Sequence, residues 1–350
     1  MPAPRARLAA LVTAALLLVL GIAPAAPAAT ATAPPTTFTW SSSDVLISPQ
    51  PDAAHDIVSV KDPTVVRHDG KWHVFATTAN TDGEWSLTYT SFRNWAEADT
   101  APQYHLDQTA IGEGYRAAPQ VFYFAPEKTW YLIYQTGLPS YSTTTDISDP
   151  TSWSAPRNFQ EEMPPIVEEN IGNGYWLDYW VICDDTMCHL FSSDDNGQLY
   201  RAETSVEEFP HGFDNTVIAM EDTKENLFEA ANVYRLGDAD RYLLLVEAIG
   251  AEGRRYFRSW TSDSIAEGWT PLAATESDPF AGAANVTFPR GSWTEDISHG
   301  EMLRSGTDQT MEIHPCRFQY LYQGMDPSAG GDYSQLPWRL GLLTQRHARC

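Results

Sequence analysis

Basic residues are scarce in this chain. Its 350 residues include 22 lysines and arginines against 46 aspartates and glutamates, which gives a formal net charge of −24 at pH 7. So strong a negative charge disfavours binding to nucleic acid or to anionic membrane surfaces, because both carry charge of the same sign. It suits a soluble secreted protein whose partner is neutral or weakly charged.

Cysteine is also rare, with four residues. An even number in an exported chain predicts two disulfides. Cys183 and Cys188 flank a predicted turn and would bridge one hairpin, and Cys316 would then pair with Cys350. A zinc site is the alternative for these cysteines, but no pair shows the two-residue spacing that such sites favour.

Several common motifs are missing. The sequence contains no G-x-S-x-G elbow, no H-E-x-x-H helix, no phosphate-binding glycine loop and no dinucleotide fingerprint. Amphipathic helical periodicity is nearly absent as well. We therefore expect an all-β protein without an organic cofactor.

The chain begins with the pattern of a secretory signal peptide. Arg5 and Arg7 precede an apolar run from residue 8 to residue 23, and small residues follow it. A membrane anchor is the alternative, but the run is short and leads into a segment rich in proline and threonine. We predict a signal peptide over residues 1–29, a disordered leader over 30–39 and a single domain over 40–350.

The strongest local signal is a hairpin over residues 61–78 (KDPTVVRHDGKWHVFATT). β-Branched and aromatic strands flank an Asp69-Gly70 pair, the typical sequence of a tight hairpin turn. Asp62 precedes a proline, so we expect its backbone to be extended, at the point where a loop enters a buried strand.

Four later segments repeat the plan of strand, turn and aromatic strand. Most continue into a third strand, predicted over residues 85–92, 198–204, 253–262 and 336–345. Units of this kind predict a five-bladed β-propeller, and a β-sandwich is the alternative architecture. The five units start at Asp62, Ala118, Asp178, Glu229 and His299, between 51 and 70 residues apart.

In a propeller the starts of the inner strands converge at one mouth of the axial channel. Asp62, Asp178, Glu229 and His299 would then meet, although buried unpaired charges are costly. Grouped carboxyls suit glycoside hydrolysis, in which a protonated acid serves the leaving oxygen and an ionised one activates water or attacks the sugar. A third carboxylate nearby would keep the pKa of the donor high.

Each of these residues also has a purely structural interpretation. Asp62 can cap the entry of a strand, Asp178 can be an ordinary loop acid, and a histidine such as His299 is more often hydrogen-bonded than a ligand. Glu229 stands among apolar residues and is the hardest to explain as a solvated acid. The register that the four share favours the functional interpretation.

One turn and the aromatic content stay ambiguous. Residues 193–200 have the spacing of an Asp-box, a hairpin turn common in propellers, and equally that of a generic Asn-Gly turn; neither implies catalysis. The 12 tryptophans, 16 tyrosines and 14 phenylalanines suit both sugar-binding subsites and a hydrophobic core.

Long strings between residues 40 and 345 resemble glycoside hydrolase family 62, the secreted α-L-arabinofuranosidases that act on arabinoxylan. They include KDPTVV, GYRAAPQVFYFAP, WYLIYQTG, IGNGYWLDYWVICD, LFSSDDNGQLYR, LFEAANVY, GRRYFRSWTS and DYSQLPWRLGLLTQ. The resemblance implies a five-bladed propeller, in agreement with the repeats.

The resemblance also implies roles. Asp62 would be the general base, Glu229 the general acid and Asp178 a third acid that tunes and orients the donor. Inversion of configuration is implied, with the base and acid carboxyls roughly 6.5 to 9.5 Å apart. His299 would lie beside a hydrated structural Ca²⁺ in the axial channel.

Substrate contacts are implied for two further residues, Lys61 and Tyr333. Ser334 stands where some relatives are expected to have asparagine, which affects binding of the xylan chain. We thus expect a secreted, monomeric enzyme that removes arabinofuranose side groups from arabinoxylan and its oligosaccharides, with no nucleic acid or membrane partner. The alternatives are a related propeller hydrolase, an arabinanase or β-xylosidase, and a non-catalytic carbohydrate-binding propeller.

Overall fold

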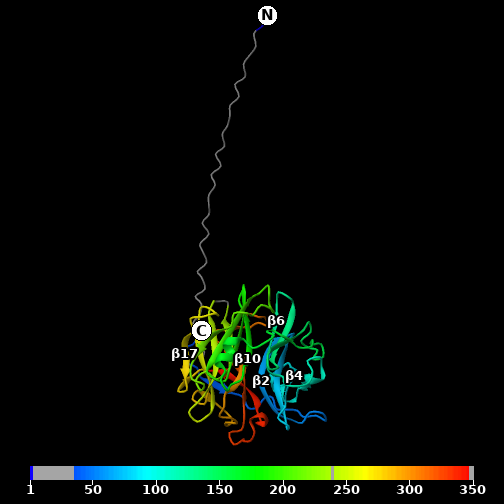
Figure 1. The fold of residues 1–350 in the computed structure, drawn as a ribbon, viewed down its shortest axis with the longest axis vertical. Helices are drawn as coiled ribbons and strands as arrows, with labels where there is room; N and C mark the ends of the chain where they lie inside the picture. The colour runs from blue at the N-terminus through cyan, green and yellow to red at the C-terminus, as the bar shows by residue number, and fades with distance from the viewer. Residues whose placement is uncertain (3–34, 238–239, 347–350) are drawn as a thin grey trace. The chain divides into compact units, whose positions relative to one another are not determined.

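The computed structural model describes residues 1–2, 35–237 and 240–346, and its strands form five sheets (Figure 1). The first three sheets follow the chain, each with four strands in sequence order. Their strands are β2 (Ile57–His68), β3 (Lys71–Asn80), β4 (Trp85–Phe92) and β5 (Tyr104–His105); β6 (Ala117–Phe124), β7 (Thr129–Gln135), β8 (Pro139–Thr144) and β9 (Arg157–Asn158); and β10 (Leu177–Cys183), β11 (Met187–Ser193), β12 (Gln198–Ser205) and β13 (Val217–Glu221).

The fourth and fifth sheets are larger. The fourth contains β14 (Glu229–Leu236), β15 (Tyr242–Ile249), β16 (Arg255–Ser262), β17 (Thr270–Thr275), β18 (Asp278–Pro279) and β21 (Glu312–Ile313). The fifth contains β20 (Ser298–Met302), β22 (Gln319–Gly324), β23 (Arg339–Gln345), β1 (Trp40–Ser42) and β19 (Val286–Thr287).

The inner strands pack in a closed ring. β2 packs against β6, β6 against β10, β10 against β14, β14 against β20, and β20 against β2 again. The predicted five-bladed propeller is confirmed by this ring. Each inner strand is buried on both faces, which explains why its apolar residues run almost without interruption.

The last blade is built from both ends of the chain. β1 pairs antiparallel with β23, so residues 40–42 lie beside residues 343–345. Trp40 is fully buried and its indole N–H donates to the carbonyl of Phe280. This pairing closes the ring, because it joins the first described strand to the last blade.

The predicted hairpins have the expected turns. Asp69 and Gly70 both have positive φ, 47° and 74°, as a two-residue turn between twisted strands requires. The Cys183–Cys188 disulfide closes the β10–β11 hairpin, as predicted. The other predicted pair involves Cys350, which lies outside the described residues.

The fifth unit differs from its prediction. The segment expected to form one long second strand from residue 310 divides instead into β21 and β22. β21 pairs in parallel with β14 of the fourth blade, while β22 begins at Gln319. Pro315 lies between them and supplies no backbone N–H for a continuous ladder.

Helices are few and short in the described residues. They are α1 (Pro165–Asn170) and the 3₁₀ helices η1 (Trp95–Thr100), η2 (Leu106–Gln108) and η3 (Tyr333–Gln335). None of the helices in this part of the chain has the length and apolarity needed to cross a bilayer. The predicted signal peptide lies outside the described residues except for its first two positions.

Candidate active site

The side chains predicted for the site line one pocket of about 1250 Å³. They are Lys61, Asp62, Asp178, Glu229, His299 and Tyr333. They come from four of the five blades and from η3, and the second blade contributes Gln135. The axial mouth therefore brings together residues that are far apart in the sequence.

A β-bulge near the start of each inner strand shapes this mouth. The pairing shifts between Lys61 and Thr64 on β2, and in four equivalent places on the other inner strands. Inside the bulge the backbone is left-handed at Asp62, Ala118, Asp178 and Ala230, with φ between 48° and 56°. An extra residue at this point bends the strand and redirects its side chain, as bulges beside functional sites commonly do.

Two details of the predicted strand starts are wrong. Asp62 is not extended and does not begin a strand, because β2 starts at Ile57 and Asp62 lies within its bulge with φ of 48°. The predicted register is also off by one residue in the fourth blade. Ala230 is the residue that occupies the bulge position of Asp62 and Asp178. Glu229 is instead equivalent to Lys61, because each is the last residue paired with the second strand before the bulge.

Hydrogen bonds between blades fix these bulges. The backbone N–H of Asp62 donates to Oε1 of Gln323 at 2.6 Å, and that of Asp178 donates to Oε1 of Gln135 at 3.0 Å. In both cases the acceptor lies on the second strand of the preceding blade. Because the backbone of each acid is held from a neighbouring blade, its carboxyl is positioned by the ring as a whole.

Asp62 has two basic neighbours. Its Oδ2 lies 3.6 Å from Nζ of Lys61, and its Oδ1 lies 3.5 Å from Nδ1 of His299. The side chain of Asp62 is only 7% exposed. The ammonium group of Lys61 therefore places a positive charge beside this buried carboxyl group.

Asp178 lies beside both Ala230, the neighbour of Glu229 in the chain, and His299, the neighbour of Asp62 in the pocket. Its Oδ2 accepts a hydrogen bond from the backbone N–H of Ala230 at 2.9 Å and lies 3.6 Å from Nδ1 of His299. Burial is the main cause that raises the pKa of Asp178, and the nearby His299 opposes this rise. Asp178 therefore fixes the backbone next to Glu229 and adds negative charge near it.

Glu229 has a strongly raised pKa. Burial raises the pKa of its carboxyl well above the usual value, and the charges of Glu247 and Asp178 add to the rise. Arg255 opposes it, with Nη1 3.8 Å from Oε1 of Glu229. A carboxyl that keeps its proton near neutral pH can act as a general acid.

Three polar residues of the site escaped the sequence analysis. Glu247 is fully buried opposite Glu229, accepts hydrogen bonds from Ser298 and His299, and lies 3.3 Å from Nη1 of Arg255. Burial raises its pKa to about 7. The sequence did contain a signal for Glu247, because it is the single acid within the apolar run LLLVEAI.

The three residues are Glu247, Arg255 and Asp195. Asp195 belongs to the segment 193–200, from which no catalytic role was expected, yet it lines the pocket beside Glu229. Burial is the main cause that raises its pKa, to about 6. The turn places it there with φ of 55°, a conformation that the sequence pattern does not report.

Aromatic side chains form one wall of the pocket. Nζ of Lys61 lies 3.7 Å from the ring centroid of Trp85 and 5.2 Å from that of Tyr333. Tyr115 also contacts Trp85, with ring centroids 5.9 Å apart. Tyr333 and Tyr115 are 46% and 44% exposed, so their ring surfaces are available to a ligand. Flat exposed rings at a pocket rim suit stacking against sugars.

Comparison with known proteins identifies the family. Residues 39–344 match glycosyl hydrolase family 62. The chain belongs to this family. It is 60% identical to the catalytic domain of the family-62 α-L-arabinofuranosidase of Coprinopsis cinerea, with a TM-score of 0.88 over 90% of this chain and 99% of that chain. A family-62 hydrolase solved with xylotriose is 52% identical, with a TM-score of 0.86 over 89% of this chain and 98% of the other.

A longer relative is α-L-arabinofuranosidase C of Cellvibrio japonicus, which is 44% identical over 308 residues. The match covers 87% of this chain and 46% of that protein, so the chain spans about half its length. The predicted family and the predicted enzyme class, a glycoside hydrolase among α-L-arabinofuranosidases, are confirmed. Membership of family 62 decides against the related propeller family of arabinanases and β-xylosidases.

Proposed function

We propose that this family-62 chain is a secreted enzyme that removes single α-L-arabinofuranose side groups from arabinoxylan and leaves the xylan backbone intact. The proposal rests on one observation: Asp62, Asp178 and Glu229 line a single pocket, in which burial raises the pKa of Glu229. The relative that binds xylotriose supports a xylan chain as the ligand. The charged and apolar segments at the N-terminus support secretion.

The proposed reaction is a single displacement with inversion. Glu229 gives its proton to the glycosidic oxygen as the bond from that oxygen to the anomeric carbon breaks. Asp62 takes a proton from a water molecule, whose oxygen bonds to the anomeric carbon on the opposite face. The products are arabinose of inverted configuration and an unsubstituted xylose unit, and the two carboxyls exchange their protonation states.

Other residues maintain the difference between these two acids. Lys61 places a positive charge beside Asp62, whereas burial, and then the charges of Glu247 and Asp178, raise the pKa of Glu229. Two carboxyls with opposed environments are what an acid and a base in one pocket require. Trp85 and Tyr333 of the aromatic wall, together with Lys61 beside them, would contact the sugar chain at the rim.

We also propose a structural Ca²⁺ in the axial channel, and the residues there fit such an ion. A small cavity of about 10 Å³ lies behind the pocket, lined by His299, Asp178 and Asn232. Oδ1 of Asn232 is buried and has no hydrogen-bond partner in the described part of the chain. His299, the oxygen of Asn232 and bound water would hold the ion, which would supply positive charge near the carboxylates.

Product analysis tests the substrate and the mode of action. Incubation with arabinoxylan should release free arabinose without shortening the xylan, because the pocket encloses one side group while the chain lies across its rim. Chromatography of the products checks this, with debranched arabinan as the comparison substrate. Release of xylose or xylo-oligomers would overturn the proposal. Proton NMR in the first minutes should show the inverted anomer.

A change at Asp195 should shift the pH dependence. The charge of Asp195 raises the pKa of Glu229, so the neutral Asp195→Asn should lower that pKa. The donor then loses its proton at lower pH, and the alkaline limb of the kcat/KM profile should move to lower pH. Asparagine also tolerates the left-handed backbone of this position. Asp185→Asn, at an exposed acid outside the pocket, is the control; an unmoved limb in Asp195→Asn would contradict the argument.

A further inference from the structure

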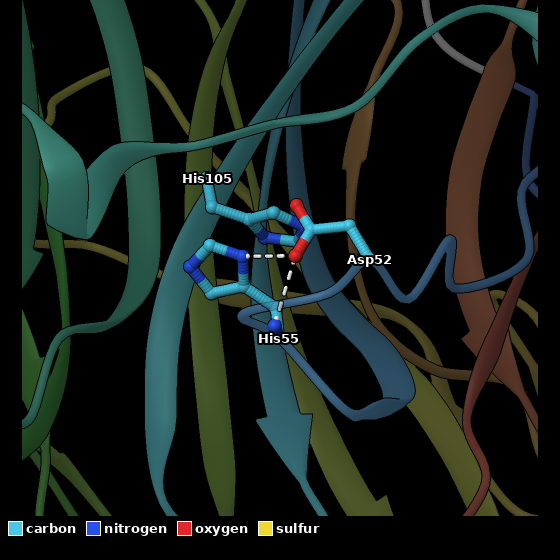
Figure 2. Close-up of side chains that lie close together, drawn as sticks. All are labelled: Asp52, His55 and His105. Carbon is cyan, nitrogen blue, oxygen red and sulfur yellow. Dashed lines mark hydrogen bonds and ion pairs between the residues drawn. The ribbon is translucent and has the colours of Figure 1, made fainter.

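Two histidines and an aspartate meet at the edge of the first blade. Asp52 and His55 lie in the loop before β2, and His105 ends β5 (Figure 2). One potential ligand atom from each of the three lies within 4.8 Å of the other two. His55 and His105 also line the pocket that holds the catalytic acids. None of the three has a role in the reaction proposed above.

We propose that Asp52, His55 and His105 form a binding site for a divalent transition-metal ion, with Zn²⁺ as the fitting example. Imidazole nitrogen and carboxylate oxygen are the ligands that zinc uses, and three protein ligands leave positions for water. Calcium prefers six to eight oxygen ligands and does not suit two imidazoles. The inference stands on this geometry and does not depend on the proposed reaction.

The hydrogen bonds of Asp52 leave one of its oxygens available. Its Oδ1 accepts from the backbone N–H groups of Ala54 and His55 at 2.8 and 2.9 Å, which fixes the loop. Its Oδ2 lies 3.9 Å from Nε2 of His105. Two ligands of a tetrahedral zinc ion with bonds of roughly 2 Å lie about 3.3 Å apart, so a small approach of these two atoms would complete the geometry.

The remaining atoms are also arranged for a metal. Nδ1 of His55 faces Asp52 at 2.8 Å, while Nε2 of His55 lies 3.1 Å from Oδ2 of Asp107 (Figure 2 shows the first contact). Histidines that bind metals commonly donate their second N–H to a carboxylate, which fixes the tautomer and turns the other nitrogen to the ion.

Burial differs among the three proposed ligands. The side chains of His55 and His105 are 11% and 5% exposed, and their rings stack with centroids 4.0 Å apart. Asp52 is 54% exposed, so water can reach the open positions of an ion bound beside its carboxylate. An ion here would link the loop before β2 to the edge strand β5 in the wall of the pocket.

Calorimetry on tag-free, chelator-stripped protein tests the site. Titration with ZnCl₂ should show one equivalent bound at this cluster, and Co²⁺ should give a visible spectrum of a nitrogen- and oxygen-ligated ion. His55→Ala and His105→Ala should each remove or greatly weaken this binding. Asp107→Asn should weaken it about 10- to 100-fold, as expected for a residue that orients a ligand. His211→Ala, at an exposed position outside the pocket, should bind as the parent does.

Two further measurements distinguish this cluster from the axial channel and from a loss of folding. Because His105 is buried, Asp52→Asn is the second variant: it removes the charged ligand at an exposed position and should also weaken Zn²⁺ binding while circular dichroism stays unchanged. Titration with Ca²⁺ reports on the axial channel and should not respond to changes at His55. Zn²⁺ binding that survives the His55 and His105 variants, or that is lost only in His299→Ala, would overturn the proposal.

Discussion

Glu229→Gln is expected to lower kcat on arabinoxylan by about 10²- to 10⁴-fold or more, because the amide has no acidic proton for the leaving oxygen. The kcat of the variant on an aryl arabinofuranoside should fall much less, since the aryl leaving group departs without protonation. Comparison of kcat for the two substrates measures the difference. Binding of xylotriose, followed by calorimetry, should persist because the aromatic wall is unchanged.

Glutamine is the appropriate replacement at this position. It keeps the size of the side chain, and Arg255 retains Glu247 as its partner at 3.3 Å. An equal loss on both substrates would contradict an acid role for Glu229. Loss of xylotriose binding together with activity, in a folded variant, would indicate that the residue holds the ligand instead.

Asp62→Asn should lower kcat by a similar factor of about 10²- to 10⁴-fold, but equally on arabinoxylan and on the aryl substrate. The attacking water needs a base whatever the leaving group is, and an amide cannot accept its proton. Measurement of kcat on both substrates therefore separates the base from the acid.

The backbone of Asp62 decides the choice of variant. Its φ of 48° is tolerated by asparagine far better than by alanine, so Asp62→Asn keeps the bulge and its hydrogen bond to Gln323. Lys61 keeps its contact with Trp85. Lys71→Ala, at a partly exposed position on the same hairpin outside the pocket, is the control for local disturbance. A selective loss on arabinoxylan alone would argue against the base role of Asp62.

The local elements were largely predictable from the sequence. The turn at Asp69 and Gly70, the disulfide between Cys183 and Cys188 and the third strand over residues 85–92 all match the structure. These features depend on neighbouring residues, whose conformational preferences and side-chain alternation act over a few positions. The number of repeats then sufficed to predict the number of blades.

The bulges were not predictable from the same pattern. A proline after Asp62 favours an extended backbone locally, yet the ring imposes φ of 48° and holds it through Gln323 of the last blade. The one-residue shift at Glu229 has the same origin. Each bulge inserts a residue whose place depends on pairing with another strand, and a local pattern carries no record of it.

The electrostatic partners of the acids were equally hidden. Glu247 and Arg255 meet Glu229 only because β14, β15 and β16 are neighbours in one sheet. Each on its own resembles an ordinary charge in a strand. Their effect on the pKa of Glu229 arises from burial and distance, which are properties of the assembled pocket.

By itself the sequence determined the repeated strand units, the acids at the start of three of them and the likeness to family 62. Only the tertiary structure decided that β1 completes the last blade and that the bulges direct these acids into one pocket. It also decided that Asp52, His55 and His105 lie close together. The physical reason is the same in each case. Alternation and turn chemistry act between neighbours along the chain, whereas ring closure, bulge position and charge coupling act between residues that only folding brings together.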